Sequence, residues 1–391
     1  MKICDLTQFY SPLSGGVKRY VHEKIRYIQD ASAEDEHVLI IPGPKTEVIS
    51  DRRSRIYSIH SPLLSRTSRY RALLNLRAVE HVFERERPDL IEVGDPYQTA
   101  WKAIASGEAL RIPVIAFYHS HFPEAYLRGA ERFLGRTASE MVIELAARYV
   151  RKLYNCFETT LVPSHQLAAV LKDWGVRNVR AVDLGVNSEV FRADSNDRQQ
   201  TRHSLGADSA QRLLLYVGRL APEKNVQTLF AAFELLTQRH PHRYQLLVIG
   251  DGTQRSALET LQARTSSVTW LRYCTESAEL ARYYRAADLF VHPGLQETFG
   301  FVAIESQACG TPVAGISGSY MDRNILHEQS AWAKENSPTA LADAIEALSG
   351  QDLAALGASA AERVALQYAW PRVFSGLFSI YREVCASYSR A

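Results

Sequence analysis

Two glutamates in the C-terminal half, Glu297 and Glu305, are separated by seven residues around an expected strand-to-helix junction. The apolar run 288–293 predicts a buried parallel strand, and the sequence after Gly300 predicts a helix that ends at Cys309-Gly310-Thr311-Pro312. Glu297 is therefore expected on the loop after the strand. Glu305 is expected about two turns into the helix, on the same side of its N-terminal end.

The start of this helix also offers backbone N–H groups. Those of Phe299, Gly300 and Phe301 are expected to point out of the helix N-terminus, where the helix dipole favours phosphate, and Thr298 lies beside them. Carboxylates accept hydrogen bonds from hydroxyls, so the stretch suits a molecule with a polyol at each end and phosphates between, such as a nucleotide sugar. The alternative interpretation is that both acids only stabilise a helix N-terminus.

Two cations follow an earlier apolar strand in the same half. Arg219 and Lys224 lie in a turn between the expected strand 213–217 and the expected helix 226–239. Cations at a helix N-terminus can clamp a diphosphate, because they add formal charge to the helix dipole. The alternative is that both side chains are only solvated.

These motifs resemble those of the retaining glycosyltransferases of family 4, which have the GT-B fold. The paired glutamates match that family's signature, and Gly218-Arg219 followed by Glu223-Lys224-Asn225 is similar to its Gly-Arg…Glu-Lys-Asn motif. The resemblance covers nearly the whole chain. It implies two Rossmann-like, doubly wound parallel-sheet α/β domains that face each other across a cleft, as in bacterial mannosyl and glucosyl transferases that act on lipid or glycan acceptors.

The resemblance also implies roles for individual residues. Glu297 would hold the donor sugar, Glu305 the ribose hydroxyls, and Arg219 and Lys224 the diphosphate. His119, at the carboxyl end of the expected strand 114–118, would orient the sugar, and His121 is the weaker candidate for that role. Without the resemblance, the alternative is that His119 is a structural hydrogen bonder. The further donor-binding candidates are Gly15 and Gly16 (otherwise a plain tight turn), Gly218, Gly252, and Tyr273 and Cys274 near the nucleobase.

Composition limits the protein class. A chain of 391 residues predicts two domains, which we place at 1–190, together with a returning helix over 371–391, and at 205–370, with a linker over 192–208. A net charge of +2 argues against nucleic acid as the main partner. The five cysteines form no Cys-x-x-Cys pair and no Asp-x-Asp pair is present, so we predict neither a metal site nor a cofactor.

The expected location is the cytoplasm, because no signal peptide or apolar run of 18 residues is found. Two stretches of the first domain, 63–77 and 124–155, combine arginines with large apolar residues. They suit contact with an anionic membrane at its inner face. The alternative is a core helix with a solvated basic face.

Our primary hypothesis is a retaining, metal-independent glycosyltransferase. It would move a hexose from a GDP-mannose-like or UDP-glucose-like donor to a hydroxyl acceptor, and a lipid, a glycan and a small polyol stay open as acceptors. The alternatives are a sugar-nucleotide epimerase or phosphorylase of the same fold, or a catalytically silent nucleotide-sugar-binding protein. A nicotinamide site is poorly supported, since Arg255 occupies the last glycine position of a Gly-x-Gly-x-x-Gly pattern.

Overall fold

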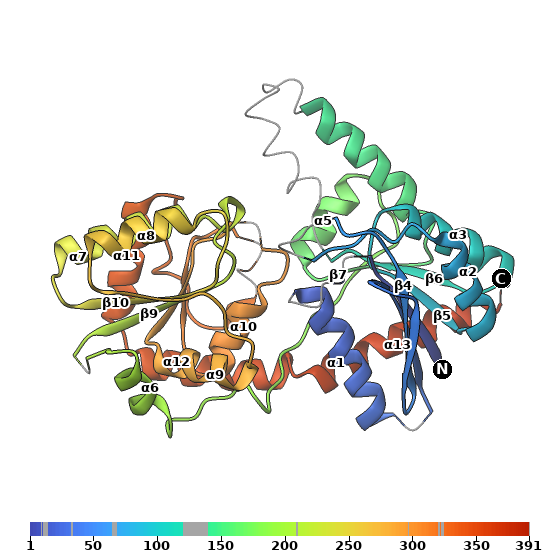
Figure 1. The fold of residues 1–391 in the computed structure, drawn as a ribbon. Helices are drawn as coiled ribbons and strands as arrows, with labels where there is room; N and C mark the ends of the chain where they lie inside the picture. Colours follow the sequence, from blue (N-terminus) through green and yellow to red (C-terminus); the bar gives the residue numbers. More distant parts are fainter. Residues whose placement is uncertain are drawn as a thin grey trace. The chain divides into compact units, whose positions relative to one another are not determined.

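The structure is a computed structural model of the chain. It describes residues 1–391 except 9, 11–14, 33, 65–68, 120–139, 209, 296, 320, 322–323 and 391. The chain divides into two compact units (Figure 1). The first comprises Met1–Leu184 and Trp370–Ala391, and the second comprises Gly185–Ala369.

The first unit is built on one sheet. Its strands are β1 (Lys2–Leu6), β2 (Glu36–Gly43), β3 (Glu47–Asp51), β4 (Ser54–His60), β5 (Leu90–Val93), β6 (Val114–Phe117), β7 (Thr160–Val162) and β8 (Val179–Ala181). They lie in the order β3-β4-β2-β1-β5-β6-β7-β8. Neighbours are parallel except β3 and β4, which form an antiparallel hairpin at the sheet edge that the sequence analysis did not predict.

Helices cover both faces of this sheet (Figure 1). They are α1 (Gly16–Ala31), α2 (Leu76–Glu86), α3 (Gln98–Leu110), α5 (His165–Asp173), α13 (Trp370–Tyr388) and a helix described over 140–154. Helices α1 and α13 contact each other, as do α2 and α3. The returning helix that we expected over 371–391 is α13, which begins one residue earlier, at Trp370. Proline is tolerated in a first helical turn, where its missing N–H would have no intrahelical partner.

A buried ionic cluster ties α13 to the sheet. Lys24 on α1 is fully buried, and its Nζ donates to Asp5 Oδ1 on β1 at 2.9 Å, to Glu92 Oε1 on β5 at 3.0 Å and to the Tyr381 hydroxyl on α13 at 2.9 Å. Burial raises the pKa of the Asp5 carboxyl, but Lys24 and His37 outweigh burial and lower that pKa to about 2. Tyr381 also donates to Glu92 Oε2, so the cluster holds the C-terminal helix through charged groups of two other elements, α1 and β5.

The second unit is also a parallel α/β layer structure. Its strands are β9 (Arg212–Val217), β10 (Tyr244–Ile249), β11 (Val268–Leu271), β12 (Leu289–His292) and β13 (Val313–Gly315). They lie in the order β11-β10-β9-β12-β13, and every neighbouring pair is parallel. The near-continuous apolar runs of β9, β10 and β12 fit strands that are buried on both faces.

The helices described in the second unit pack around this sheet. They are α6 (Arg198–Ser204), α7 (Val226–Arg239), α8 (Arg255–Arg264), α9 (Ser277–Ala286), α10 (Phe301–Ala308), α11 (Pro338–Ser349) and α12 (Leu353–Gln367). Helices α7, α8 and α11 cover one face, and α9, α10 and α12 cover the other (Figure 1).

The stretch 192–208, which we expected to be a linker, is part of the second unit. It contains α6, which contacts α9. Arg198 and Arg202 on α6 form ion pairs with Asp288 at 2.7 and 2.9 Å. The polar composition that suggested a solvated linker thus reflects a helix fastened to the sheet by charge pairs.

Candidate active site

The central feature of the second unit is an ion pair between Lys224 and Glu297. Lys224 ends a short 3-10 helix (Pro222–Lys224) after β9, and Glu297 lies on the loop after β12. Because β9 and β12 are parallel neighbours, the loops at their carboxyl ends leave the same edge of the sheet. Lys224 Nζ contacts Glu297 Oε2, and the side chains are 24% and 20% exposed.

The electrostatics of this pair fix the protonation state of Glu297. Burial raises the pKa of its carboxyl, but Lys224 and His292 outweigh burial and hold that pKa well below its usual range. His292 is the last residue of β12, is buried, and places Nε2 3.6 Å from Glu297 Oε2. Glu297 is therefore a carboxylate that can accept hydrogen bonds throughout the physiological pH range.

Tyr216 on β9 links this pair to Arg219. Its hydroxyl donates to the backbone carbonyl of Arg219 at 2.9 Å, which fixes the start of the loop after β9. Burial, followed by the charge of Glu297, raises the pKa of Tyr216. The Arg219 guanidinium is paired with Glu223 at 2.8 Å and the side chain is 72% exposed. The structure thus brings Lys224, but not the guanidinium of Arg219, into contact with Glu297.

Glycines shape the loops on this edge. Gly300 caps α10 with φ 81°, and a Cβ there would lie 2.3 Å from Met321 Sδ. A Cβ at Gly252 would lie 2.4 Å from the Leu220 carbonyl oxygen. The loop after β10 can therefore approach the loop that carries Arg219 and Lys224 only because position 252 lacks a side chain.

Glu305 occupies a different environment from Glu297. It lies in the second turn of α10 and is 1% exposed, and the Tyr284 hydroxyl donates to its Oε2 at 3.2 Å. Phe299 is buried as well, and its carbonyl accepts a hydrogen bond from Asn324 Nδ2 at 2.6 Å. Thr298 is half-buried and Phe301 opens α10. The ribose-binding role of Glu305 stays a prediction.

Tyr273 and Cys274 follow β11, two strands from β9 in the sheet order. The Tyr273 side chain is 57% exposed. Burial, followed by Glu279, raises the pKa of the Cys274 thiol to about 11, so this cysteine stays protonated near neutral pH. A protonated thiol is a poor nucleophile, and contact of Tyr273 and Cys274 with a nucleobase stays a prediction.

His119, the candidate from the first unit, follows β6 and is packed among aromatic rings. Its ring stacks on Phe117 at a centroid distance of 4.2 Å and meets Tyr20 edge-on at 5.3 Å. Burial, followed by the charge of Lys24, lowers the His119 pKa to about 3, so the imidazole is neutral near pH 7. Gly15, with φ 136°, caps α1 and Gly16 opens it. His121 lies outside the described residues, and contact of His119 with a donor sugar stays a prediction.

Comparisons with known proteins identify the family of the chain. Residues 197–362 match the family model for glycosyl transferases group 1, and residues 14–190 match the model for glycosyltransferase family 4. The D-inositol 3-phosphate glycosyltransferase of Thermobispora bispora is 32% identical over 318 residues, which cover 73% of this chain and 68% of that protein. The chain belongs to glycosyltransferase family 4. It is therefore an enzyme that transfers a sugar.

Other relatives of this glycosyltransferase span more of its length. The GDP-mannose-dependent alpha-(1-6)-phosphatidylinositol dimannoside mannosyltransferase of Mycobacterium tuberculosis is 28% identical over 354 residues, 89% of this chain and 87% of that protein. Among solved structures, sucrose-phosphate synthase from Thermosynechococcus elongatus has a TM-score of 0.75 at 22% identity and covers 99% of both chains. Anabaena HepE in complex with UDP and glucose has a TM-score of 0.73 at 15% identity, covering 98% of this chain and 100% of that one. The predicted GT-B fold is thereby confirmed.

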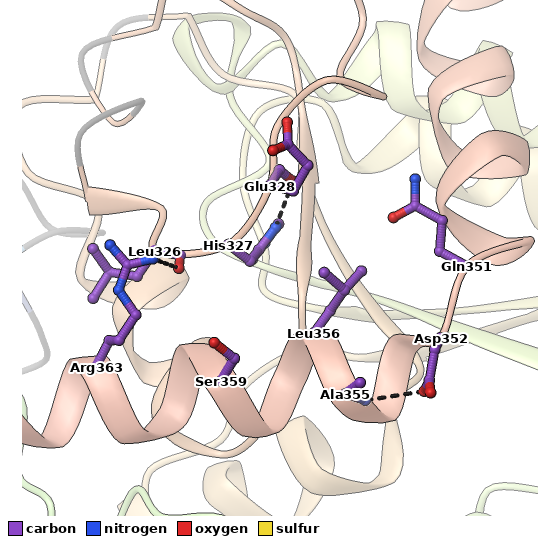
Figure 2. A pocket seen from close by; sticks show the side chains of 9 residues that line it. All are labelled: Leu326, His327, Glu328, Gln351, Asp352, Ala355, Leu356, Ser359 and Arg363. Atoms are coloured by element: carbon purple, nitrogen blue, oxygen red, sulfur yellow. Dashed lines mark hydrogen bonds between the residues drawn. The ribbon is translucent and has the colours of Figure 1, made fainter.

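A pocket of about 380 Å³ elsewhere on the second unit of the glycosyltransferase contains none of the predicted site residues (Figure 2). Three of its polar side chains make hydrogen bonds that hold the fold together. Arg363 donates to the Leu326 carbonyl, Asp352 caps α12 by accepting from the Ala355 N–H, and His327 accepts from the Val313 N–H. We therefore assign this pocket a structural role.

Two contacts at the candidate site were not predicted by the sequence analysis. The first is between the buried His292 and the carboxylate of Glu297. The sequence signal for it was a histidine at the end of an apolar strand, five residues before a predicted site glutamate. Asn225 has φ 55° and donates from Nδ2 to the Pro293 carbonyl at 2.9 Å, which joins the loop after β9 to the loop after β12. Asparagine is among the residues that tolerate this left-handed conformation.

Proposed function

We propose that this glycosyltransferase moves a hexose from a nucleotide diphosphate sugar to a hydroxyl acceptor with retention of configuration, and that Lys224 and Glu297 form the centre of its donor site. The observation that carries the proposal is the ion pair at the edge where β9 and β12 end. A cation and a carboxylate at this place match the two chemical halves of the donor, a diphosphate and a polyol.

Lys224 would stabilise the leaving diphosphate. Negative charge grows on the diphosphate as the bond from the anomeric carbon to phosphate oxygen breaks, and a fixed cation in a partly buried site favours that charge. The N-terminus of α10, on the loop that follows Glu297, adds its dipole. Arg219 would supply a second cation, because its guanidinium is exposed and Tyr216 holds the backbone of the loop that carries it.

Glu297 would hold the sugar. Its depressed pKa keeps it ionised, so it accepts hydrogen bonds from sugar hydroxyls and does not serve as a proton donor. Retention is implied by the family 4 resemblance. In this proposal the acceptor oxygen bonds to the anomeric carbon, the departing phosphate takes the acceptor proton, and a nucleoside diphosphate leaves. We propose that no metal or other cofactor is needed, and that EDTA leaves the rate unchanged.

The relatives suggest the substrate classes. The Mycobacterium tuberculosis relative and an alpha-mannosyltransferase of Corynebacterium glutamicum are named as GDP-mannose-dependent. We therefore favour GDP-mannose over UDP-glucose as the donor class. One relative acts on a phosphatidylinositol dimannoside and another on D-inositol 3-phosphate, which supports an inositol-bearing lipid or glycan as the acceptor.

We further propose that the first unit contacts an anionic membrane from its cytoplasmic side. In the helix over 140–154, Met141, Leu145 and Tyr149 recur every four residues and are 66%, 57% and 37% exposed. Leu64 and Leu74 in the other basic stretch are 66% and 61% exposed. No described helix is long and apolar enough to cross a bilayer. Co-sedimentation with vesicles of anionic but not neutral lipid, weakened by Met141→Ser with Leu145→Ser, is the expected result.

The transfer reaction itself can be tested with the purified chain. GDP-mannose or UDP-glucose would be incubated with and without phosphatidylinositol vesicles or D-inositol 3-phosphate, and nucleoside diphosphate release would be measured. We expect release with GDP-mannose that depends on acceptor, and an α-linked product by NMR. Epimerised donor without acceptor, or donor binding without any release in either arm, would favour one of the alternative functions over transfer.

A further inference from the structure

A pocket lined by arginines lies in the second unit, far from Lys224. This pocket of about 540 Å³ is lined by residues that include Arg198, Arg202, Arg212, Arg243, Gln211 and Asp288. These residues come from α6, the start of β9, the segment before β10 and the segment before β12. The pocket is therefore assembled by four parts of one unit.

The charges in this pocket are unbalanced. Three guanidinium groups gather around the single carboxylate of Asp288, at 2.7 Å from Arg198, 2.9 Å from Arg202 and 3.8 Å from Arg212. Asp288 also accepts the Leu213 N–H at 2.7 Å. The carboxylate is thus already saturated, and the positive charge of the lining exceeds what it neutralises.

Two of the arginines are available for a ligand. Arg202 is committed to the fold, because its guanidinium also donates to the carbonyls of Asp208 and Gln211 at 2.8 and 2.7 Å. Arg212 is 40% exposed, and its guanidinium makes long contacts with described residues, the one to Asp288 at 3.8 Å and one to the Ser349 carbonyl at 3.4 Å. Arg243 is exposed, and its guanidinium lies over the Tyr244 ring at 5.5 Å; it forms no ion pair within the described part of the chain.

The position of the pocket separates it from the donor site. Arg212 begins β9 and Asp288 directly precedes β12, whereas Lys224 and Glu297 follow the other ends of the same two strands. A six-residue strand spans about 20 Å. The pocket therefore lies at the amino ends of the strands, and the Lys224–Glu297 pair lies at their carboxyl ends.

We propose that this pocket, which we name the Arg212–Arg243 pocket, binds a small molecule that carries phosphate groups. Guanidinium groups bind phosphate oxygens in pairs, and a dianion would neutralise the excess charge around Asp288. The volume falls within the range of ligand sites and exceeds that of one phosphate. No aromatic ring is among its described lining residues, so recognition rests on phosphate and hydroxyl groups rather than on stacking with a base.

The ligand would join α6 to the starts of β9 and β10. It would therefore stabilise the segment by which the chain enters the second unit, because α6 begins at Arg198, 13 residues after Gly185, the first residue of that unit. Ligand binding at this pocket does not require the proposed donor site to be correct. A ligand bound here would not block the carboxyl ends of β9 and β12, where Lys224 and Glu297 lie.

Pyrophosphate is a suitable probe, provided that the donor site is disabled. We would measure the thermal midpoint of Lys224→Met with pyrophosphate, using sodium chloride of equal ionic strength as the salt control. We expect pyrophosphate to raise the midpoint by about 3 °C or more at saturating concentration. Hydrogen exchange should slow over 198–214 and 241–246.

A matched pair of variants decides the assignment. In the Lys224→Met background, Arg212→Gln with Arg243→Gln should abolish the shift, whereas Arg264→Gln, which removes a 65%-exposed arginine of the same unit, should keep it. Arg243→Gln alone should weaken binding at least tenfold and touches no described ion pair, so it guards against loss of folding. No shift in Lys224→Met, or equal shifts in both variants, would overturn the proposal.

Discussion

Replacing Lys224 by methionine removes the ammonium group that faces Glu297 while keeping most of the side-chain length. Removing one preorganised group that stabilises transition-state charge costs about 10²–10³ in kcat. We therefore expect kcat/KM for the nucleotide sugar to fall at least ~100-fold, or about 2.7 kcal/mol of transition-state stabilisation. The loss should appear mainly in kcat, because the charge on the diphosphate grows as the glycosidic bond breaks.

The same change has a separate and smaller effect on folding. Both side chains of the pair are about one-fifth to one-quarter exposed, at 24% and 20%. Losing Lys224 should therefore cost about 2 kcal/mol of unfolding free energy, between the value for an exposed pair and that for a fully buried pair. Lys224→Met with Glu297→Gln removes both charges, so it should recover most of this stability and none of the activity.

The assay is nucleoside diphosphate release with donor concentration varied, alongside urea denaturation of each variant. Arg264→Met, which removes an arginine that is 65% exposed and paired with Glu234 at 2.9 Å, is the control and should keep full activity. Activity of Lys224→Met within about threefold of the wild-type value would refute the diphosphate clamp. An equal loss in Arg264→Met would show that the effect is not specific to Lys224.

Three further predictions concern stability. Glu297→Gln should lose less unfolding free energy than the wild type as the pH falls from 5 to 3. Because the folded-state pKa of Glu297 is low, the carboxylate stabilises the fold fully above its unfolded pKa of about 4.3, and this stabilisation is progressively lost in acid. Urea denaturation that shows the same loss with pH for both proteins would contradict this. Lys24→Met should cost about 3–5 kcal/mol of unfolding free energy, because it leaves the buried carboxylates of Asp5 and Glu92 without their cation. The control Lys172→Met, at an exposed position, should change stability by less than about 0.5 kcal/mol. A loss below about 1 kcal/mol for Lys24→Met would argue against the ionic cluster. Gly300→Ala should cost about 1–3 kcal/mol, because its Cβ would meet Met321 Sδ at 2.3 Å in a left-handed conformation, and an unchanged thermal midpoint would count against this.

The sequence predicted the elements that carry the site because their signals are local. The apolar runs of β9 and β12 stop at glycine or proline, and α7 lies at Val226–Arg239 as expected. Each of these two strands is followed by a loop with charged residues. Because the strands are parallel, both loops leave the sheet at the carboxyl ends of the strands. The contact of Lys224 with Glu297 follows from that adjacency, although the two residues are 73 positions apart.

Other features depend on tertiary contacts that no local pattern encodes. Lys24 meets Tyr381 across 357 positions, so the ionic cluster under α13 has no signature in either segment. The charged stretch around α6 resembled a linker because its partner, Asp288, lies about 90 residues later. The burial of Glu305 beside Tyr284 likewise depends on how α10 rests on α9.

The most direct test of the donor site is a crystal structure of the chain with bound GDP. We expect Lys224 Nζ to leave Glu297 and to lie about 2.7–2.9 Å from a phosphate oxygen, with the diphosphate near the N-terminus of α10. A diphosphate bound elsewhere, with the Lys224–Glu297 ion pair intact, would contradict the central claim.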